Sequence, residues 1–247
     1  MHEVKPVLTP MPTSLSLSLY SGSFLSDPSQ YRTVVGILQF LLITRPGIAF
    51  AVNKLSQYMH CPTTECWSFV KCLLRYLVGT INDDLQIFHD SSLSLYAFSD
   101  VDWVGDKDTF SSTSAYVVYL GKTPVSWSSK KQRTVARSST KAEYRSVANT
   151  AVEIQWICYL LFDLGVMLPC CSIIYYDNIG ANQLCSNLVF HSRMKHVAID
   201  FQVQNNALCV AHIFSADQIA NALTEPLSRQ LFLHLKFKIR LLSRAPS

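Results

Sequence analysis

The sequence LYAFSD at residues 95–100 decides the fold, because an apolar strand-like run leads directly into an aspartate. The sequence IIYYD at residues 173–177 repeats this arrangement without polar alternation, which is typical of a central strand covered on both faces. Open α/β sheets form their sites at the carboxyl ends of such strands. We therefore expect Asp100 and Asp177 to belong to one site, although an aspartate that only ends a strand and starts a turn is the common alternative.

Further strand and helix signals surround these two sequences and predict an α/β fold. Strands are expected at residues 85–89, 93–100, 114–120, 124–128, 173–176 and 208–214, and helices at 140–164, 180–186 and 216–223. A run of strands followed by alternating strands and helices indicates a mixed five-stranded sheet with flanking helices. A small helical segment is expected to precede this sheet.

The chain divides into four predicted segments. Residues 1–27 are rich in Ser, Pro and Thr and are expected to form a poorly ordered arm. Residues 28–84 carry helical patterns, with two short helices broken at Arg45-Pro46 and a third from Thr64 to Val78. The sheet domain is expected at 85–226, followed by a C-terminal tail at 227–247.

Glu143 distinguishes a metal site from a pair of unrelated strand ends. The sequence TKAE at residues 140–143 matches a capping box, in which Glu143 would bond back to the start of its helix. However, helical spacing from Glu143 gives the apolar stripe that must face the sheet: Val147, Ala151, Ile154, Cys158 and Leu161. A buried carboxylate needs a cation or strong donors. A divalent metal held by Asp100, Glu143 and Asp177 would supply one, and oxygen ligands favour Mg²⁺ or Mn²⁺ over zinc.

Two basic segments suggest a nucleic acid as the substrate. The first contains Trp127, Lys130, Lys131, Arg133 and Arg137, and the second, FHSRMKH at residues 190–196, contains Arg193, Lys195 and His196. Cations beside hydroxyls and an aromatic ring suit a phosphate backbone, whereas a solvated cationic loop is the simpler alternative.

Composition places the chain among folded proteins without a membrane segment. It is 49% hydrophobic with a net charge of +4, and its eight cysteines include no pair at metal-finger spacing. The apolar run at residues 34–43 is too short to span a bilayer, and no signal peptide is apparent. We expect a soluble protein with reduced thiols, cytoplasmic or nuclear rather than secreted.

These sequences, taken together, resemble the ribonuclease H region of copia-type retrotransposon Pol polyproteins. The resemblance is carried by SDVDW at 99–103, STS at 112–114, SWSSKKQ at 126–132, RSST at 137–140, AEY at 142–144, YDN at 176–178 and DQIA at 217–220. Residues 28–84 resemble the connection segment of the reverse transcriptase region in the same polyproteins.

The resemblance implies a ribonuclease H fold and hydrolysis of the RNA strand of RNA/DNA hybrids with two Mg²⁺ or Mn²⁺ ions. Asp100, Glu143 and Asp177 would be ligands in the catalytic site, and the family has a fourth carboxylate where this chain has Asn221. Partners would be the hybrid and the polymerase portion of a Pol polyprotein, with no membrane and no polymerase activity. His212 either approaches the site or is an ordinary strand residue.

Asn221 leaves three readings open. The chain is a weakened metal-dependent nuclease, a catalytically dead nucleic-acid-binding remnant of a decayed retrotransposon, or a structural fragment with no selected role. An amide oxygen can still bind a metal ion, but it removes one negative charge from the site, so weaker metal binding is expected.

Overall fold

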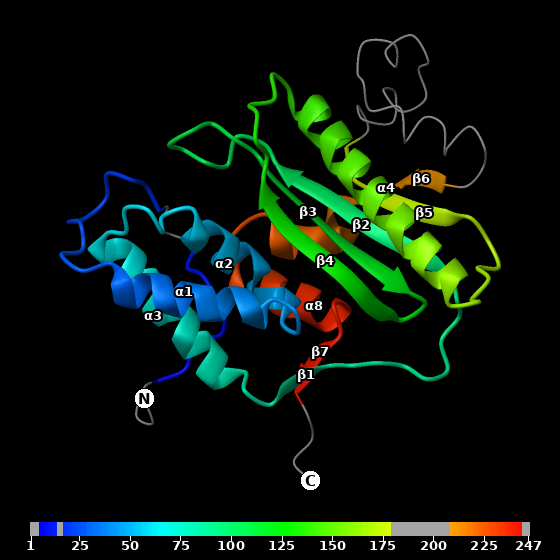
Figure 1. The fold of residues 1–247 in the computed structure, drawn as a ribbon, viewed down its shortest axis with the longest axis horizontal. Helices are drawn as coiled ribbons and strands as arrows, with labels where there is room; N and C mark the ends of the chain where they lie inside the picture. The colour runs from blue at the N-terminus through cyan, green and yellow to red at the C-terminus, as the bar shows by residue number, and fades with distance from the viewer. Residues whose placement is uncertain (1–4, 14–16, 179–207, 244–247) are drawn as a thin grey trace. The chain divides into compact units, whose positions relative to one another are not determined.

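A computed structural model describes residues 5–13, 17–178 and 208–243 (Figure 1). The chain forms two compact units, a helical unit and a sheet unit. The helical unit consists of Met1–Gln86, Asp106–Phe110 and Glu225–Ser247. The sheet unit consists of Ile87–Gly105 and Ser111–Thr224. The helical unit is therefore built from three separate stretches of the sequence.

The sheet unit contains a five-stranded sheet with the strand order β4-β3-β2-β5-β6. Its strands are β2 (Leu95–Asp102), β3 (Thr113–Leu120), β4 (Thr123–Lys131), β5 (Ser172–Tyr176) and β6 (Leu208–His212). β2, β3 and β4 pair antiparallel, whereas β5 lies parallel to both β2 and β6. The predicted mixed five-stranded α/β sheet with flanking helices is confirmed.

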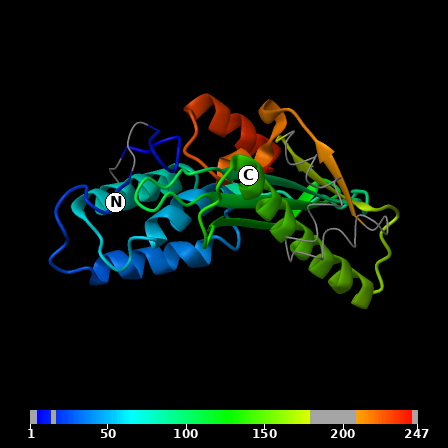
Figure 2. The same ribbon diagram turned by 90° about the horizontal axis from the view of Figure 1, so that it is seen from above.

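Helix α4 (Ser139–Asp163) covers one face of the sheet (Figures 1 and 2). Its buried side chains include Val147, Ala151 and Ile154, as the predicted stripe requires, and they pack on Leu95 and Ile174 of the sheet. Burial of aliphatic side chains contributes roughly 1.5–3 kcal/mol each relative to exposure in water. This packing fixes α4 along the central strands β2 and β5.

The opposite face of the sheet carries the short 3-10 segments η2 (Ser215–Asp217) and η3 (Ile219–Leu223), the second of which contacts β2 and β3 (Figure 2). The sequence predicted one continuous helix over 216–223, and this prediction is wrong. Gln218 interrupts the helix because it adopts an extended backbone with ψ of 98°. Its side-chain amide donates to the Ser99 carbonyl of β2 instead.

The first predicted strand, residues 85–89, does not join the main sheet. β1 (Asp83–Leu85) pairs antiparallel with β7 (Leu241–Ser243) in the helical unit. Residues 86–94 contain no strand, although Phe88 donates its backbone N–H to Thr123 Oγ1. The predicted helix at 180–186 lies outside the described residues.

The helical unit contains α1 (Ser29–Leu41), η1 (Pro46–Ile48), α2 (Ala49–Ser56) and α3 (Thr64–Gly79), with the break at Pro46 that the sequence predicted. The segment expected as a C-terminal tail forms α8 (Arg229–Lys238) before β7. The expected arm is also packed in part, because Tyr58 donates its hydroxyl to the Leu17 carbonyl and Met11 is buried. Both segments look polar or irregular in sequence, and their packing comes from contacts that are distant along the chain.

Among the described residues, no helix has both the length and the apolar character that crossing a membrane would require.

Candidate metal centre and nucleic-acid surface

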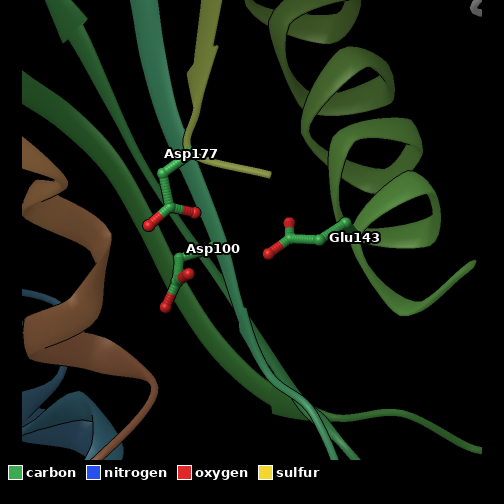
Figure 3. A group of neighbouring side chains, drawn as sticks. All are labelled: Asp100, Glu143 and Asp177. Atoms are coloured by element: carbon green, nitrogen blue, oxygen red, sulfur yellow. The ribbon is translucent and has the colours of Figure 1, made fainter. Parts of the chain in front are cut away.

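Three carboxylates meet at one end of the sheet in the sheet unit. Asp100, Glu143 and Asp177 each place an oxygen so that these atoms all lie within 4.8 Å of one another. Figure 3 shows the carboxylates of Asp177 and Asp100 beside the strands, with Glu143 reaching toward them from the start of α4. The convergence that the sequence predicted for these three residues is therefore present.

The parallel pairing of β2 with β5 explains why the two aspartates meet. Phe98 lies opposite Tyr175, so both strands carry their next residues toward the same edge of the sheet. Asp100 lies two residues from the end of β2, and Asp177 directly follows β5. This is the carboxyl edge at which α/β sheets form their sites.

The start of α4 decides the role of Glu143. The helix begins at Ser139, and its N-cap is Ser138, whose hydroxyl accepts from the Lys141 backbone N–H. Glu143 therefore lies beyond the position that a capping box requires, and the capping alternative does not hold. Instead Glu143 is buried, with only 4% of its surface exposed.

Burial and like charge act together on Glu143. Within the described part of the chain, its buried Oε2 atom has no hydrogen-bond partner. Desolvation, with the negative charges of Asp100 and Asp177 beside it, raises the pKa of the Glu143 carboxyl to about 9. A carboxyl in this position holds its proton at neutral pH unless a cation replaces that proton.

Asp100 is held from behind by buried hydroxyl groups. Thr224 Oγ1 donates to Asp100 Oδ2 at 2.5 Å, and Thr224 is fully buried. Ser146 of α4 donates to the Asp100 carbonyl, and it accepts a hydrogen bond from the Ser99 hydroxyl. Because Ser146 of α4 and the residue after η3 both bond to it, Asp100 is held by two elements besides its own strand β2.

Asn221, which the sequence suggested as the fourth ligand, lies within η3, and η3 is followed directly by the Asp100-bonded Thr224. Its Oδ1 atom is buried and has no hydrogen-bond partner among the residues that the structure describes. An amide oxygen left in this condition is a suitable cation ligand, and it shares this property with Glu143 Oε2. The three clustered carboxylates fit a hard divalent cation, because all of their donor atoms are oxygens.

His212 ends β6 and contacts the same edge of the sheet. Its Nε2 atom lies 3.1 Å from the Asp177 carbonyl oxygen. The imidazole is exposed and bonds the backbone of Asp177 rather than a carboxylate. His212 therefore approaches the site, as one of the two alternatives predicted. Its contact is with the backbone that follows β5.

The first predicted nucleic-acid segment forms the end of β4 and the loop before α4. Lys130, Arg133 and Arg137 are exposed, whereas Lys131 and Trp127 are partly buried. Gln132 and Arg145 hold the loop, because the Gln132 amide donates to the Ala142 carbonyl and Arg145 donates to the Thr134 carbonyl. The second segment, with Arg193, Lys195 and His196, lies outside the described residues.

Trp103 is a candidate that the sequence reasoning did not single out. It directly follows β2, and 46% of its surface is exposed. Its indole Nε1 donates to the Ala136 carbonyl in the basic loop at 3.1 Å. The sequence did contain a signal for Trp103, because it is an aromatic residue only three positions after Asp100.

Sequence comparison finds close relatives among transposon polyproteins. The chain is 55% identical to the retrovirus-related Pol polyprotein from transposon RE1 and 54% identical to that from transposon RE2, both of Arabidopsis thaliana, over all of its length. It is 33% identical over 94% of its length to the corresponding polyprotein from transposon TNT 1-94 of Nicotiana tabacum. The chain spans 17% of the RE1 and RE2 polyproteins and 18% of the TNT 1-94 polyprotein.

No family model matches the chain. Among solved structures, it resembles the N-terminal RNase H domain of a Mycobacterium tuberculosis protein, with a TM-score of 0.37, 12% identity, and coverage of 59% of this chain and 98% of that one. It also resembles a foamy viral protease-reverse transcriptase solved with an RNA/DNA hybrid, with a TM-score of 0.43, 12% identity, and coverage of 85% of this chain and 27% of that one.

Proposed function

Because this chain belongs to the Pol polyproteins of copia-type retrotransposons, we propose that its sheet unit is a ribonuclease H that hydrolyses the RNA strand of RNA/DNA hybrids. The observation that carries this proposal is the convergence of Asp100, Glu143 and Asp177 within 4.8 Å at the carboxyl edge of two parallel strands. Such an all-oxygen cluster suits metal-dependent phosphodiester hydrolysis.

The proposed ligands are Asp100, Glu143 and Asp177, with the amide oxygen of Asn221 as the fourth, and the proposed metal is a pair of Mg²⁺ or Mn²⁺ ions. When bound, such ions activate a water molecule and stabilise the leaving oxygen of the RNA strand. The buried oxygens Glu143 Oε2 and Asn221 Oδ1, which have no hydrogen-bond partner in the described ranges of the chain, support this ligand set.

The chain's own residues prepare the site in two ways. Thr224 and Ser146 hold Asp100 by its side chain and its carbonyl, so that its carboxylate needs little reordering when it binds a cation. Glu143 keeps its proton while the site is metal-free, because its pKa is raised to about 9. Loss of that proton therefore accompanies metal binding, and the affinity for metal rises with pH.

Asn221 sets the expected level of activity. Replacing a carboxylate by an amide keeps an oxygen ligand but removes one unit of negative charge, which weakens the attraction for two dications. We therefore propose a nuclease that is active at high metal concentration and has a lower metal affinity than an Asn221→Asp variant.

The substrate is assigned to the basic surface near the site. Lys130 at the end of β4 is exposed, as are Arg133 and Arg137 in the loop before α4, the helix that carries Glu143. Cations in such a loop suit the phosphate groups of a hybrid. The remaining part of a Pol polyprotein, including its polymerase, is the proposed protein partner.

Cleavage of a labelled RNA/DNA hybrid tests the proposal. The full chain is expected to cut the RNA strand with Mg²⁺ or Mn²⁺, and Asp100→Asn should lower the rate by at least about a thousandfold, equal to about 4 kcal/mol of activation free energy. Asp163→Asn is the matched control, since Asp163 is an exposed aspartate at the far end of α4. Equal cutting by the native chain and Asp100→Asn would show that the proposed site is wrong.

Asn221 also favours a second candidate function, in which the unit binds nucleic acid without cutting it. The two candidates separate in the same assay. If only Asn221→Asp cuts the hybrid while the native chain binds it, the chain is a binding remnant of a nuclease. Cutting by the native chain excludes this second candidate.

A further inference from the structure

Trp103 connects the strand of the proposed metal site to the basic loop. It follows the last residue of β2, three positions after Asp100, and its indole N–H is bonded to the Ala136 carbonyl. Ala136 lies between Arg133 and Arg137, two of the exposed cations proposed to contact phosphate. One side chain therefore joins the strand that carries Asp100 to the loop that carries the cations.

The backbone around Trp103 is tightly constrained. Val104 has a φ of 61°, a conformation that β-branched residues rarely adopt, and its N–H donates to Ser112 Oγ. At Gly105 a Cβ atom would lie 1.6 Å from Asp102 Oδ2, so a larger residue there would require the Asp102 side chain to move. Unusual backbone geometry of this kind often occurs where a structure aims a side chain for function.

The exposure of Trp103 is unusual for a residue held so firmly. Its ring is partly fixed by the hydrogen bond to Ala136, yet 46% of its surface faces solvent. An ordered, half-exposed indole offers a flat apolar face and loses little side-chain entropy when it binds a partner. Aromatic rings beside cations form the stacking platforms of nucleic-acid-binding proteins.

We propose that Trp103 is a nucleic-acid contact, whose indole face stacks on a base or sugar of the strand that the basic loop holds by its phosphates. This inference rests on the proposed function, because it assigns a substrate contact to the same site. It adds a contact that is apolar and nearly independent of salt to a surface that otherwise binds through charge. Trp103 then fixes the position of the strand relative to Asp100.

A purely structural role for Trp103 makes different predictions. If the indole only ties the basic loop to β2, losing its N–H matters as much as losing its ring, and the displaced cations reduce the salt dependence of binding. If the ring stacks on the nucleic acid, Trp103→Phe keeps most of the affinity although it lacks the N–H donor. Removing a stacking ring lowers affinity at every salt concentration by about the same factor.

The test measures binding of the full chain to a fluorescently labelled RNA/DNA hybrid by anisotropy, with metal chelated and at several salt concentrations. Trp103→Ala is expected to weaken binding by about 5- to 100-fold, the range of one base-stacking contact, with an unchanged salt slope. Trp103→Phe should lose only a small part of this affinity. Trp156→Ala is the matched control, since Trp156 is 58% exposed on α4, and it should bind like the native chain.

Each outcome decides one of the two proposals. If Trp103→Ala binds like the native chain, or if Trp103→Phe is as weak as Trp103→Ala, the stacking contact is wrong while the proposed nuclease stands. If the native chain neither binds nor cuts the hybrid, the proposed function fails and the contact fails with it. Circular dichroism of each variant shows whether a loss of binding comes from unfolding. If Trp103→Ala is unfolded, the affinity of Trp103→Phe decides between stacking and a purely structural role.

Discussion

The two units bury carboxylates in opposite ways. In the helical unit, Asp83 pairs with Lys236 and Asp106 pairs with Lys54, so each buried acid has a cation beside it. In the sheet unit, Glu143 instead lies beside two further acids, Asp100 and Asp177, and its pKa rises in consequence. Paired charges of the first kind serve the fold, whereas an acidic cluster of the second kind costs stability and indicates a site that binds a cation.

The largest expected effect on stability comes from breaking an ion pair of the helical unit. Asp83→Asn leaves the Lys236 ammonium buried without its partner, which should lower the free energy of unfolding by about 3–5 kcal/mol. Urea denaturation measures this loss. Asp84 is an exposed neighbour in the same strand, so Asp84→Asn should change stability little. Equal losses of stability in the two variants would show that the ion pair of Asp83 does not stabilise the helical unit.

The next largest effect concerns Glu143 of the acidic cluster, where removal of the charge should raise stability rather than lower it. Since the folded-state pKa of Glu143 is raised to about 9, its contribution to stability is present below pH 4.5 and is lost as pH rises toward 9. Glu143→Gln removes this loss and should stabilise the metal-free protein by up to about 3 kcal/mol at pH 7.

Thermal unfolding from pH 4 to 9 in the presence of a chelator measures this effect. The native chain should lose stability across the range, and the variant should lose less. A variant that is less stable than the native chain at pH 8 would show that the Glu143 carboxyl is not destabilised by its neighbours.

A smaller effect tests how Asp100 is held. Thr224→Val removes the hydroxyl that donates to Asp100 Oδ2 and should weaken Mg²⁺ binding by about tenfold, as loss of a group that orients a ligand commonly does. Titration calorimetry measures the affinity. Thr224→Ser keeps the donor and should restore most of the binding. Equal Mg²⁺ affinities of the Thr224→Val and Thr224→Ser variants would show that this hydrogen bond does not support metal binding.

The smallest effect concerns the start of α4. Ser138→Ala removes the N-cap hydroxyl and should lower stability by about 1 kcal/mol. Cleavage of the hybrid should change by only a few fold, because packing of α4 on the sheet keeps Glu143 in place. Ser139→Ala, one position later, should lower the thermal stability less. A larger loss of stability for Ser139→Ala than for Ser138→Ala would show that Ser138 is not the N-cap.

The sheet unit was largely predictable from sequence because its signals are local. The strand that carries Asp100 near its end, the strand that precedes Asp177 and the buried stripe that begins at Glu143 can each be recognised within a few residues. Their meeting then follows from the parallel strand arrangement. Trp103 shows the limit, since its exposure and its bond to Ala136 depend on a turn at Val104 that no local pattern predicts.

The helical unit was less predictable because its edges are formed by distant pairings. β1 pairs with β7, and Asp83 is opposite Ser243, which lies 160 positions later in the chain. Residues 85–89 look like part of a meander because they alternate, but only Leu85 lies in a strand, and tertiary packing decides that this strand pairs with β7. The same distance explains why α8 was taken for a tail, since its burial requires residues such as Tyr76, whose ring contacts Phe232.

The hydrogen bond from Thr224 to Asp100 joins residues 124 positions apart. A ribosome that has made β2, α4 and β5 with the following Asp177 has therefore supplied all three carboxylates but not the hydroxyl that orients the first of them. The proposed centre is completed only when the last segment of the sheet unit has been synthesised and docked. A transcript that is interrupted between residues 177 and 224 encodes the acids of the site without its finished geometry.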